Sequence, residues 1–271
     1  MTPLRDGIAP RALEGVVAAE VYIDPEPLVC AVAATGVRNA PDAAAEQVDQ
    51  LLFGEAFEVL EEEGAFVFGQ ARRDGYVGFV EAAALAPAGA APTHRVSAIR
   101  TYAFAGPSIK TRAGGPYSLG SLVTVGQVEG RLALVSGAGW MTAAHLSPIG
   151  MFEADPVAVA ERYLGAPYLW GGRESLGLDC SGLVQQALMA CGRACPRDTD
   201  QQEQMGQAIG RAEFARGDLV FWKGHVALGL DGQRILHANG HHMAVAIEPL
   251  DEAIARIAAA DSGEPTSFRR P

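Results

Sequence analysis

An internal repeat is the feature that most limits what this chain can fold into. Residues 78–85 (GFVEAAAL) match residues 139–146 (GWMTAAHL) at a constant offset of 61. Upstream, residues 53–59 match residues 119–125 in an apolar-Gly pair followed by alternating apolar positions. Short alternating runs separated by Gly-containing turns predict small antiparallel barrels. Two copies are too few for a solenoid, which needs at least three, so we predict two paired β-modules.

The sequence between the copies sets their boundaries. Residues 86–93 (APAGAAPT) are small residues and two prolines, which support neither a ladder nor a helix interior and are typical of a linker. We therefore predict one module over residues 31–88 and a second over residues 94–148. Residues 1–30 match no pattern and stay unassigned, and a third domain covers residues 153–271.

The third domain has a different rhythm. Asp155 followed by Pro156 is a good helix start, with Asp as the N-cap and Pro at the first helical position. Residues 180–190 carry apolar residues at helical spacing, and residues 251–260 predict a closing helix. Between them four runs predict strands: residues 219–222, 226–230, 234–238 and 243–248. A helix followed by a meandering sheet predicts an α+β domain.

Composition and charge exclude several classes of protein. The 271 residues carry 21 Lys+Arg and 32 Asp+Glu, a net charge of −11, whereas proteins that bind nucleic acid or anionic lipid present basic surfaces. No apolar run reaches the about 20 residues of a membrane span, and no signal peptide is visible. Four cysteines are too few for a disulfide scaffold. We expect a cytoplasmic protein that binds neither nucleic acid nor membrane, with its oligomeric state left open.

Cys180 is the candidate nucleophile. It lies in the segment Asp-Cys-Ser-Gly (residues 179–182), at the start of the helical stretch. There the unpaired backbone N–H groups and the helix dipole favour a negative charge, so we expect a lowered thiol pKa. The other interpretation is a small buried cysteine, which we assign to Cys30, Cys191 and Cys195. Two histidines downstream favour a nucleophile at position 180.

His225 and His237 are the candidate base and its partner. They lie on two predicted strands joined by a turn at residues 231–233. A three-residue loop pairs Leu230 with Arg234 and places the histidines diagonally on one face, about 7–8 Å apart at Cα. A two-residue turn places them on opposite faces, so the hypothesis depends on register. A thiolate needs an adjacent base and a group that orients it; His225 is the base, and His237 bonds its other ring nitrogen.

Two other interpretations of these residues stay open. Each histidine alone could be a half-buried strand residue, and His241 and His242 are expected in a loop. Cys180, His225 and His237 could also be three zinc ligands. The sequence has no Cys-x-x-Cys pair, so we expect neither a metal nor a cofactor.

Several motifs in one order resemble a known family. They agree in spacing over about residues 154–250: PYLWGG (167–172), LDCSGLVQ (178–185), PRDTDQQ (196–202), RGDLVFW (216–222), Gly-His (224–225) and His-Ala-Asn (237–239). They resemble the NlpC family of papain-like cysteine peptidases, in particular the γ-D-glutamyl-L-diamino-acid endopeptidases that trim cell-wall peptides. The first β-module, with LFGE followed by GYVGFV, resembles bacterial SH3-like domains.

The resemblance implies a fold and a triad. The fold is an α+β papain-like catalytic domain preceded by two small all-β SH3-like barrels. The triad is Cys180, His225 and His237, with His237 orienting the base. Tyr168 resembles a tyrosine whose hydroxyl lies beside the nucleophile and helps to stabilise the oxyanion; packing against Trp170 is the other interpretation.

The resemblance also implies a site for the substrate's amino group. In multidomain relatives the first SH3-like module captures the free amine of an N-terminal L-Ala, and Glu55 and Tyr76 match the acid and tyrosine of that site. The second copy has Ser121 in place of Glu55. Asp179 is another candidate partner for the amine, or simply an N-cap. Glu55 could instead be a solvated surface charge beside the acidic residues at 58 and 61–63.

Three further positions match substrate contacts of the family: Ser181, Arg197 and Thr199. Arg197 offers a planar fork to a substrate carboxylate. The sequence thus predicts a cysteine peptidase for murein peptides of the type L-Ala-γ-D-Glu-diamino acid, acting in cell-wall peptide recycling. Two alternatives stay open: an exported peptidase or amidase on intact peptidoglycan, and a non-catalytic murein-binding protein. The preferred diamino acid is not specified.

Overall fold

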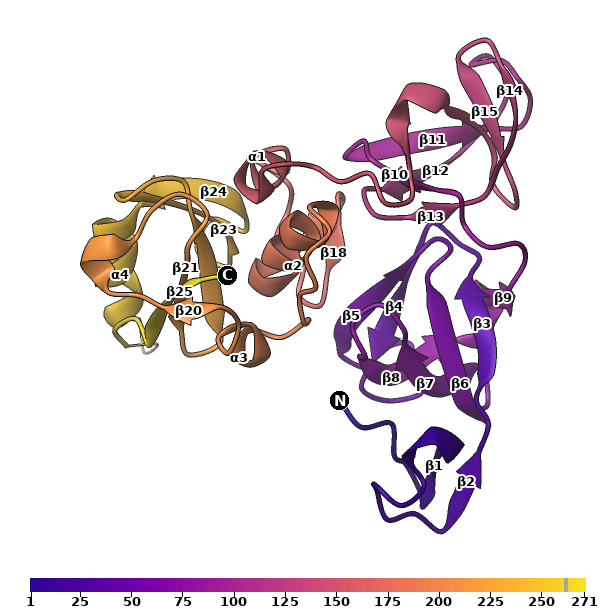
Figure 1. The fold of residues 1–271 in the computed structure, drawn as a ribbon, viewed down its shortest axis with the longest axis horizontal. Helices are drawn as coiled ribbons and strands as arrows, with labels where there is room; N and C mark the ends of the chain where they lie inside the picture. The colour runs from indigo at the N-terminus through magenta and orange to yellow at the C-terminus, as the bar shows by residue number, and fades with distance from the viewer. Residues whose placement is uncertain (261–262) are drawn as a thin grey trace. The chain divides into compact units, whose positions relative to one another are not determined.

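The computed structural model describes residues 1–260 and 263–271 and divides into two compact units, Met1–Met151 and Phe152–Pro271 (Figure 1). Unit 1 is built from strands and short 3₁₀ turns, whereas unit 2 combines four α-helices with a sheet among its described residues. In the part of the chain that the structure describes, no helix is long and apolar enough to cross a membrane.

A seven-stranded antiparallel sheet forms the first part of unit 1. Leu51, Phe57 and Val67 are buried in its core. Across the sheet the strands are β5 (Gln47–Leu52), β4 (Ala34–Arg38), β8 (Val77–Glu81), β7 (Phe66–Ala71), β6 (Ala56–Glu63), β3 (Glu26–Cys30) and β9 (Leu85–Pro87). Among the described residues this ladder does not close on itself, so the structure has an open sheet where the sequence predicts a barrel. It also starts before residue 31, because β3 pairs with β6 and β9.

The N-terminal residues, which the sequence left unassigned, pack on this sheet. They form a parallel pair, β1 (Ile8–Pro10) and β2 (Val21–Ile23), around the 3₁₀ turn Arg11–Leu13. Arg5 makes ion pairs with Glu61 and Glu63 of β6, and its guanidinium lies 4.8 Å from the Phe79 ring centroid.

The second part of unit 1 repeats an arrangement of the first. In the first copy β8 leads through the 3₁₀ turn Ala82–Ala84 into β9; in the second, β16 (Gly139–Thr142) leads through Ala143–His145 into β17 (Leu146–Pro148). The sequence repeat is therefore a structural repeat. The other strands of this part are β10 (His94–Val96), β11 (Arg100–Phe104), β12 (Ala113–Ser118), β13 (Leu122–Val123), β14 (Val125–Glu129) and β15 (Leu132–Val135).

The two parts of unit 1 join at the apolar-Gly pair of the repeat. The Phe53 ring packs edge-on against Tyr117, with centroids 5.2 Å apart, in the core of the second part. Leu122 donates its backbone N–H to the Phe53 carbonyl at 2.8 Å. Gly54 has a φ of +78°, and a Cβ there would lie 2.1 Å from the Leu122 carbonyl oxygen, so this position requires glycine.

The sheet of unit 2 places both candidate histidines. Its order is β20 (Gln207–Ala208), β25 (Ser267–Arg270), β21 (Leu219–Trp222), β22 (His225–Gly229), β23 (Arg234–Asn239) and β24 (Ala244–Pro249). Leu230 donates its N–H to the Arg234 carbonyl at 2.9 Å, and Leu228 lies opposite Leu236. The predicted three-residue loop is confirmed, and with it the position of His225 and His237 on one face.

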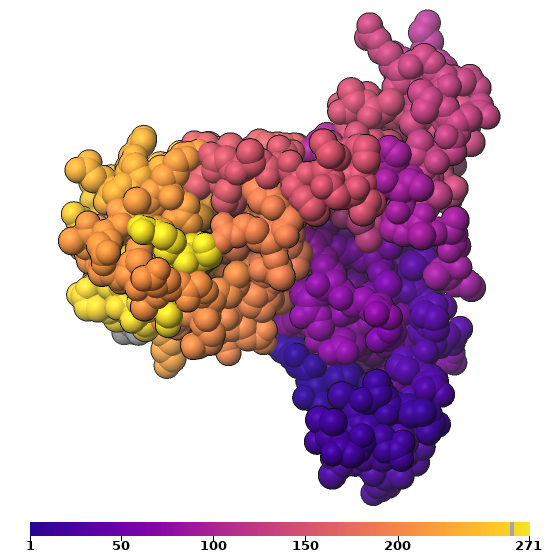
Figure 2. Space-filling model, viewed as in Figure 1, coloured from indigo at the N-terminus to yellow at the C-terminus, as the bar shows by residue number. Residues whose placement is uncertain are grey.

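Two strands of this sheet, β20 and β25, have no counterpart in the prediction. β25 comes from the last residues of the chain and pairs with β21 and with β20. Figure 2 shows these C-terminal residues, in yellow, at the surface of unit 2 among residues drawn in orange.

Helices complete unit 2. The Asp155 carboxylate accepts the Val157 N–H at 2.8 Å and caps α1 (Pro156–Glu161), as predicted. Helix α2 (Cys180–Ala190) contacts β22 and β23 and lies beside the sheet in Figure 1. The remaining elements are the short α3 (Thr199–Gln202), the closing helix α4 (Leu250–Ala258), the 3₁₀ turn Arg211–Glu213 and the small hairpin of β18 (Arg173–Glu174) and β19 (Gly177–Leu178).

Candidate active site

The start of α2 holds the candidate nucleophile. Cys180 is the first residue of the helix, and Asp179 is its N-cap. The Asp179 carboxylate accepts the N–H of Gly182 at 2.8 Å and the N–H of Gly171 at 2.9 Å. The N-cap interpretation of Asp179 is confirmed, and Cys180 faces the site from a fixed helix end.

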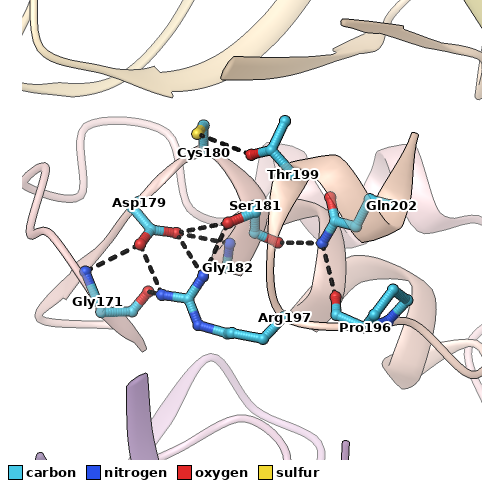
Figure 3. A network of polar contacts seen from close by, with 10 residues as sticks. Gly171, Asp179, Cys180, Ser181, Gly182, Pro196, Arg197, Thr199 and Gln202 are labelled. Carbon is cyan, nitrogen blue, oxygen red and sulfur yellow. Dashed lines mark hydrogen bonds and ion pairs between the residues drawn. The ribbon is translucent and has the colours of Figure 1, made fainter. Parts of the chain in front are cut away.

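Arg197 forms an ion pair with the same Asp179 carboxylate (Figure 3). Its guanidinium donates to the two Asp179 oxygens at 2.6 and 3.0 Å and to the Ser181 hydroxyl at 2.8 Å, and both charged groups are buried. The fork that the sequence assigns to a substrate carboxylate holds Asp179 instead, because a buried anion needs its cation close by. Arg197 and Ser181 therefore position the helix start in this structure.

The thiol of Cys180 lies among polar groups from two other segments. Its Sγ is 3.9 Å from the Thr199 hydroxyl, and the backbone N–H of Val226, next to His225, hydrogen-bonds the sulfur. Burial and the Asp179 charge nevertheless raise the pKa of Cys180 to about 11, against these two contacts. The prediction of a lowered pKa is wrong for this environment, since burial outweighs the helix end. The thiol is protonated at neutral pH and depends on a base.

The two histidines form the first link of a relay. His225 Nε2 lies 2.8 Å from His237 Nδ1, and His237 Nε2 lies 2.6 Å from Glu248 Oε1. Arg256 of α4 pairs with the same carboxylate oxygen. His237 is fully buried, so it is held by these contacts rather than half-exposed on a strand.

The relay fixes which ring nitrogens carry protons. Burial, together with His237 and Arg256, lowers the pKa of His225 to about 3, and burial also lowers the pKa of His237. Burial of Glu248 is outweighed by hydrogen bonds from His237 and Arg256, which hold the pKa of Glu248 at about 2. A carboxylate only accepts, so His237 carries its proton on Nε2 and His225 donates from its own Nε2. His225 Nδ1 is then the unprotonated, basic nitrogen.

Glu248 and Arg256 are functional residues that were not predicted from the sequence. Ala246 lies opposite His237 in the sheet, so Glu248, two residues further along β24, is its diagonal neighbour on the same face. Extending the histidine register by one more strand would have found the carboxylate. No local pattern indicates Arg256, which reaches the relay from α4.

Tyr168 belongs to the same group of residues. Burial and the adjacent Cys180 charge raise the pKa of its hydroxyl well above the ordinary value. The first interpretation of Tyr168, with its hydroxyl beside the sulfur, stays a prediction. Within the described residues, no group of three or more His, Cys, Asp or Glu side chains is arranged to hold a metal ion.

Glu55 and Tyr76 belong to unit 1. Glu55 is buried, accepts the Leu52 N–H at 2.9 Å and forms an ion pair with Arg73. Its interpretation as a solvated surface charge is therefore wrong. Tyr76 lies in the core of the seven-stranded sheet. Ser121, which takes the place of Glu55 in the second copy, is also buried.

Comparison with known proteins places these elements in families. The pattern of the NlpC/P60 family matches residues 165–259, which hold Cys180, His225 and His237. The chain carries an NlpC/P60 domain. The pattern of the bacterial dipeptidyl-peptidase SH3 domain matches residues 37–85, which precede the NlpC/P60 domain in the sequence. That match ends within the first copy of the repeat, so an SH3-like second module stays a prediction.

Relatives of the NlpC/P60 domain are similar over part of their length. Gamma-D-glutamyl-L-lysine dipeptidyl-peptidase of Bacillus subtilis is 34% identical over 108 residues, 37% of this chain and 36% of that protein. Peptidoglycan endopeptidase RipB of Mycobacterium tuberculosis is 34% identical over 107 residues, 33% of this chain and 44% of that protein. The chain thus spans less than half the length of these two relatives. The crystal structure of an NlpC/P60 family protein from Bacillus cereus has the same fold, with a TM-score of 0.77 and 19% identity over 90% of this chain and 99% of that one.

Proposed function

We propose that this protein is a cysteine peptidase that hydrolyses the γ-D-glutamyl–diamino-acid bond of murein peptides with a free N-terminal L-Ala. The observation that carries the proposal is the relay from His225 through His237 to Glu248, which leaves one basic nitrogen beside the segment that contacts Cys180. The name of the Bacillus subtilis relative describes a bond of the same class. A cytoplasmic role in recycling such peptides is part of this proposal.

In the first half-reaction Cys180 Sγ attacks the γ-carbonyl carbon while His225 Nδ1 takes the thiol proton. The imidazolium that forms is stabilised through His237 by the Glu248 carboxylate. In this proposal the Tyr168 hydroxyl donates to the developing oxyanion. The C–N bond then breaks, His225 gives its proton to the leaving amine, and an acyl-enzyme remains. Water, deprotonated by His225, releases the acid and restores the thiol.

Replacing the nucleophile tests this proposal. Cys180→Ala is expected to lower release of the diamino acid from L-Ala-γ-D-Glu-diaminopimelate by at least about 1000-fold, since no acyl-enzyme forms. The release is measured by chromatography of the free diamino acid. Cys191→Ala, at the end of the same helix, is the matched control and keeps full activity. Turnover by the Cys180 variant at the wild-type rate contradicts the proposal.

Blocking the substrate's amine tests the finer specificity. If Glu55 and Tyr76 bind the free amine, the N-acetylated tripeptide has a kcat/KM at least about 10-fold below that of the free tripeptide, because a charge-assisted contact is lost. Glu55 has to exchange its ion pair with Arg73 for the substrate amine. Equal rates on both peptides remove Glu55 and Tyr76 from the substrate site.

Hydrolysis of intact peptidoglycan is the second candidate function, favoured by the name of the RipB relative. Release of soluble peptides from purified sacculi, and a location outside the cytoplasm in fractionated cells, would select it. The complete relay argues against the non-catalytic alternative, because a binding module has no need of an oriented base.

A further inference from the structure

Unit 2 has a cavity of about 470 Å³ that shares His225 with the candidate active site. Asn239, His241 and Arg256 also line it, and none of its described lining residues is acidic. The mechanism above uses His225 and the pairing of Arg256 with Glu248, but it does not use the cavity. Its polar groups therefore need an explanation of their own.

Asn239 presents a donor that nothing in the described chain uses. The residue is 4% exposed, and its side-chain oxygen accepts the backbone N–H of His242 at 2.8 Å, which fixes the orientation of the amide. The amide nitrogen is buried and has no hydrogen-bond partner among the described residues. Leaving such a donor unpaired is costly, so native structures rarely do so without a reason.

Arg256, which lines the same cavity, has a second donor of this kind. One terminal nitrogen of its guanidinium pairs with Glu248, while its buried Nε is likewise without a hydrogen-bond partner in the residues described. Two N–H donors without partners, one of them on a guanidinium, thus belong to residues that line a cavity without an acidic residue, and such a pair suits a carboxylate.

The position of the cavity indicates which carboxylate. His225 gives a proton to the leaving amine, so the leaving amino acid lies on the His225 side of the scissile bond. The α-carboxylate of that amino acid is two bonds from its amine nitrogen. We propose that Asn239 and Arg256 bind the free α-carboxylate of the leaving diamino acid, so that the enzyme prefers substrates in which this residue is C-terminal. This inference rests on the proposed function.

A change in the substrate tests it on the wild-type protein. L-Ala-γ-D-Glu-L-Lys and its C-terminal amide differ only in the group that enters the cavity. We expect kcat/KM for the free acid to be about 10- to 100-fold higher, the effect of losing one or two charge-assisted hydrogen bonds. Equal values overturn the inference and leave the proposed function intact. Cleavage of neither peptide overturns the proposed function and the inference with it.

A variant ties the preference to the cavity. Asn239→Asp keeps the oxygen that accepts from His242 and turns the free donor into a carboxylate oxygen that repels the substrate. The acid-to-amide ratio of kcat/KM is expected to fall to about one or below, and because both substrates meet the same variant, a changed His225 cancels in the ratio. Gln233→Glu adds the same charge in the exposed turn and is expected to keep the wild-type ratio. An Asn239→Asp variant that keeps the preference overturns the inference; if that variant does not fold, the two substrates on wild type still decide.

Discussion

Two carboxylates flank the reacting pair, and the protein holds them in different ways. Asp179, on the nucleophile side, is buried and accepts backbone N–H groups and both arms of Arg197, all from residues 171–197. Glu248, on the base side, is partly exposed and bonds His237 and Arg256, which come from a strand and from the closing helix. The nucleophile side is thus a closed structural network, whereas the base side is an open relay that sets protonation.

The largest effect is expected where the closed network loses its cation. Arg197→Met leaves Asp179 charged, buried and unpaired by its cation, so the free energy of unfolding is expected to fall by about 3–5 kcal/mol. Urea unfolding followed by tryptophan fluorescence measures it. Arg234→Met removes the exposed pair with Asp231 and is expected to cost at most about 1 kcal/mol. If both variants lost the same free energy of unfolding, the buried pair of Arg197 and Asp179 would be no more important for stability than the exposed pair.

On the base side the effect is expected in the rate. Glu248→Gln keeps the size of the side chain but removes the charge that stabilises imidazolium, so kcat is expected to fall at least about 10-fold with KM little changed. The same change lowers the pKa of His225 further, because Glu248 raises it, and shifts the acid limb of the kcat profile to lower pH. Glu252→Gln, exposed on α4, is the control. A loss of stability with an unchanged pH profile would make Glu248 merely structural.

The smallest effect is expected in the slope of stability against pH, measured per pH unit. The pKa of His225 is lowered to about 3 in the folded protein, so below its ordinary value of 6.5 the unfolded chain binds a proton that the folded one does not. The free energy of unfolding therefore falls as the pH drops from about 6.5 towards 3, by at most about 1.4 kcal/mol per pH unit for this group. Urea unfolding at pH 4, 5 and 6 is expected to show a shallower slope for His225→Asn than for wild type. Identical slopes would mean that His225 titrates freely in the folded state.

Features that depend on neighbours in sequence could be predicted from the sequence, whereas contacts between distant parts of the chain could not. The caps Asp155 and Asp179 and the turn that pairs Leu230 with Arg234 depend on neighbours in sequence, and all were predicted. The partner of Asp179 and the thiol pKa depend on what burial brings together, and there the expectations failed. Glu248 was within reach of a register argument, whereas β25 and Arg256 arrive from parts of the chain with no local signal.

The contact between Phe53 and Tyr117 bears on how unit 1 can be taken apart. The two segments share a sequence repeat, yet the Phe53 ring of the first segment is part of the hydrophobic core of the second. Gly54 allows the close approach of the two backbones at this point. Separating the segments at the linker, residues 86–93, would leave a cavity in the core of the second segment and expose the Phe53 ring on the first. We therefore expect residues 26–148 to be transferable to another protein only as one block, because the second segment needs the Phe53 ring of the first to fill its core.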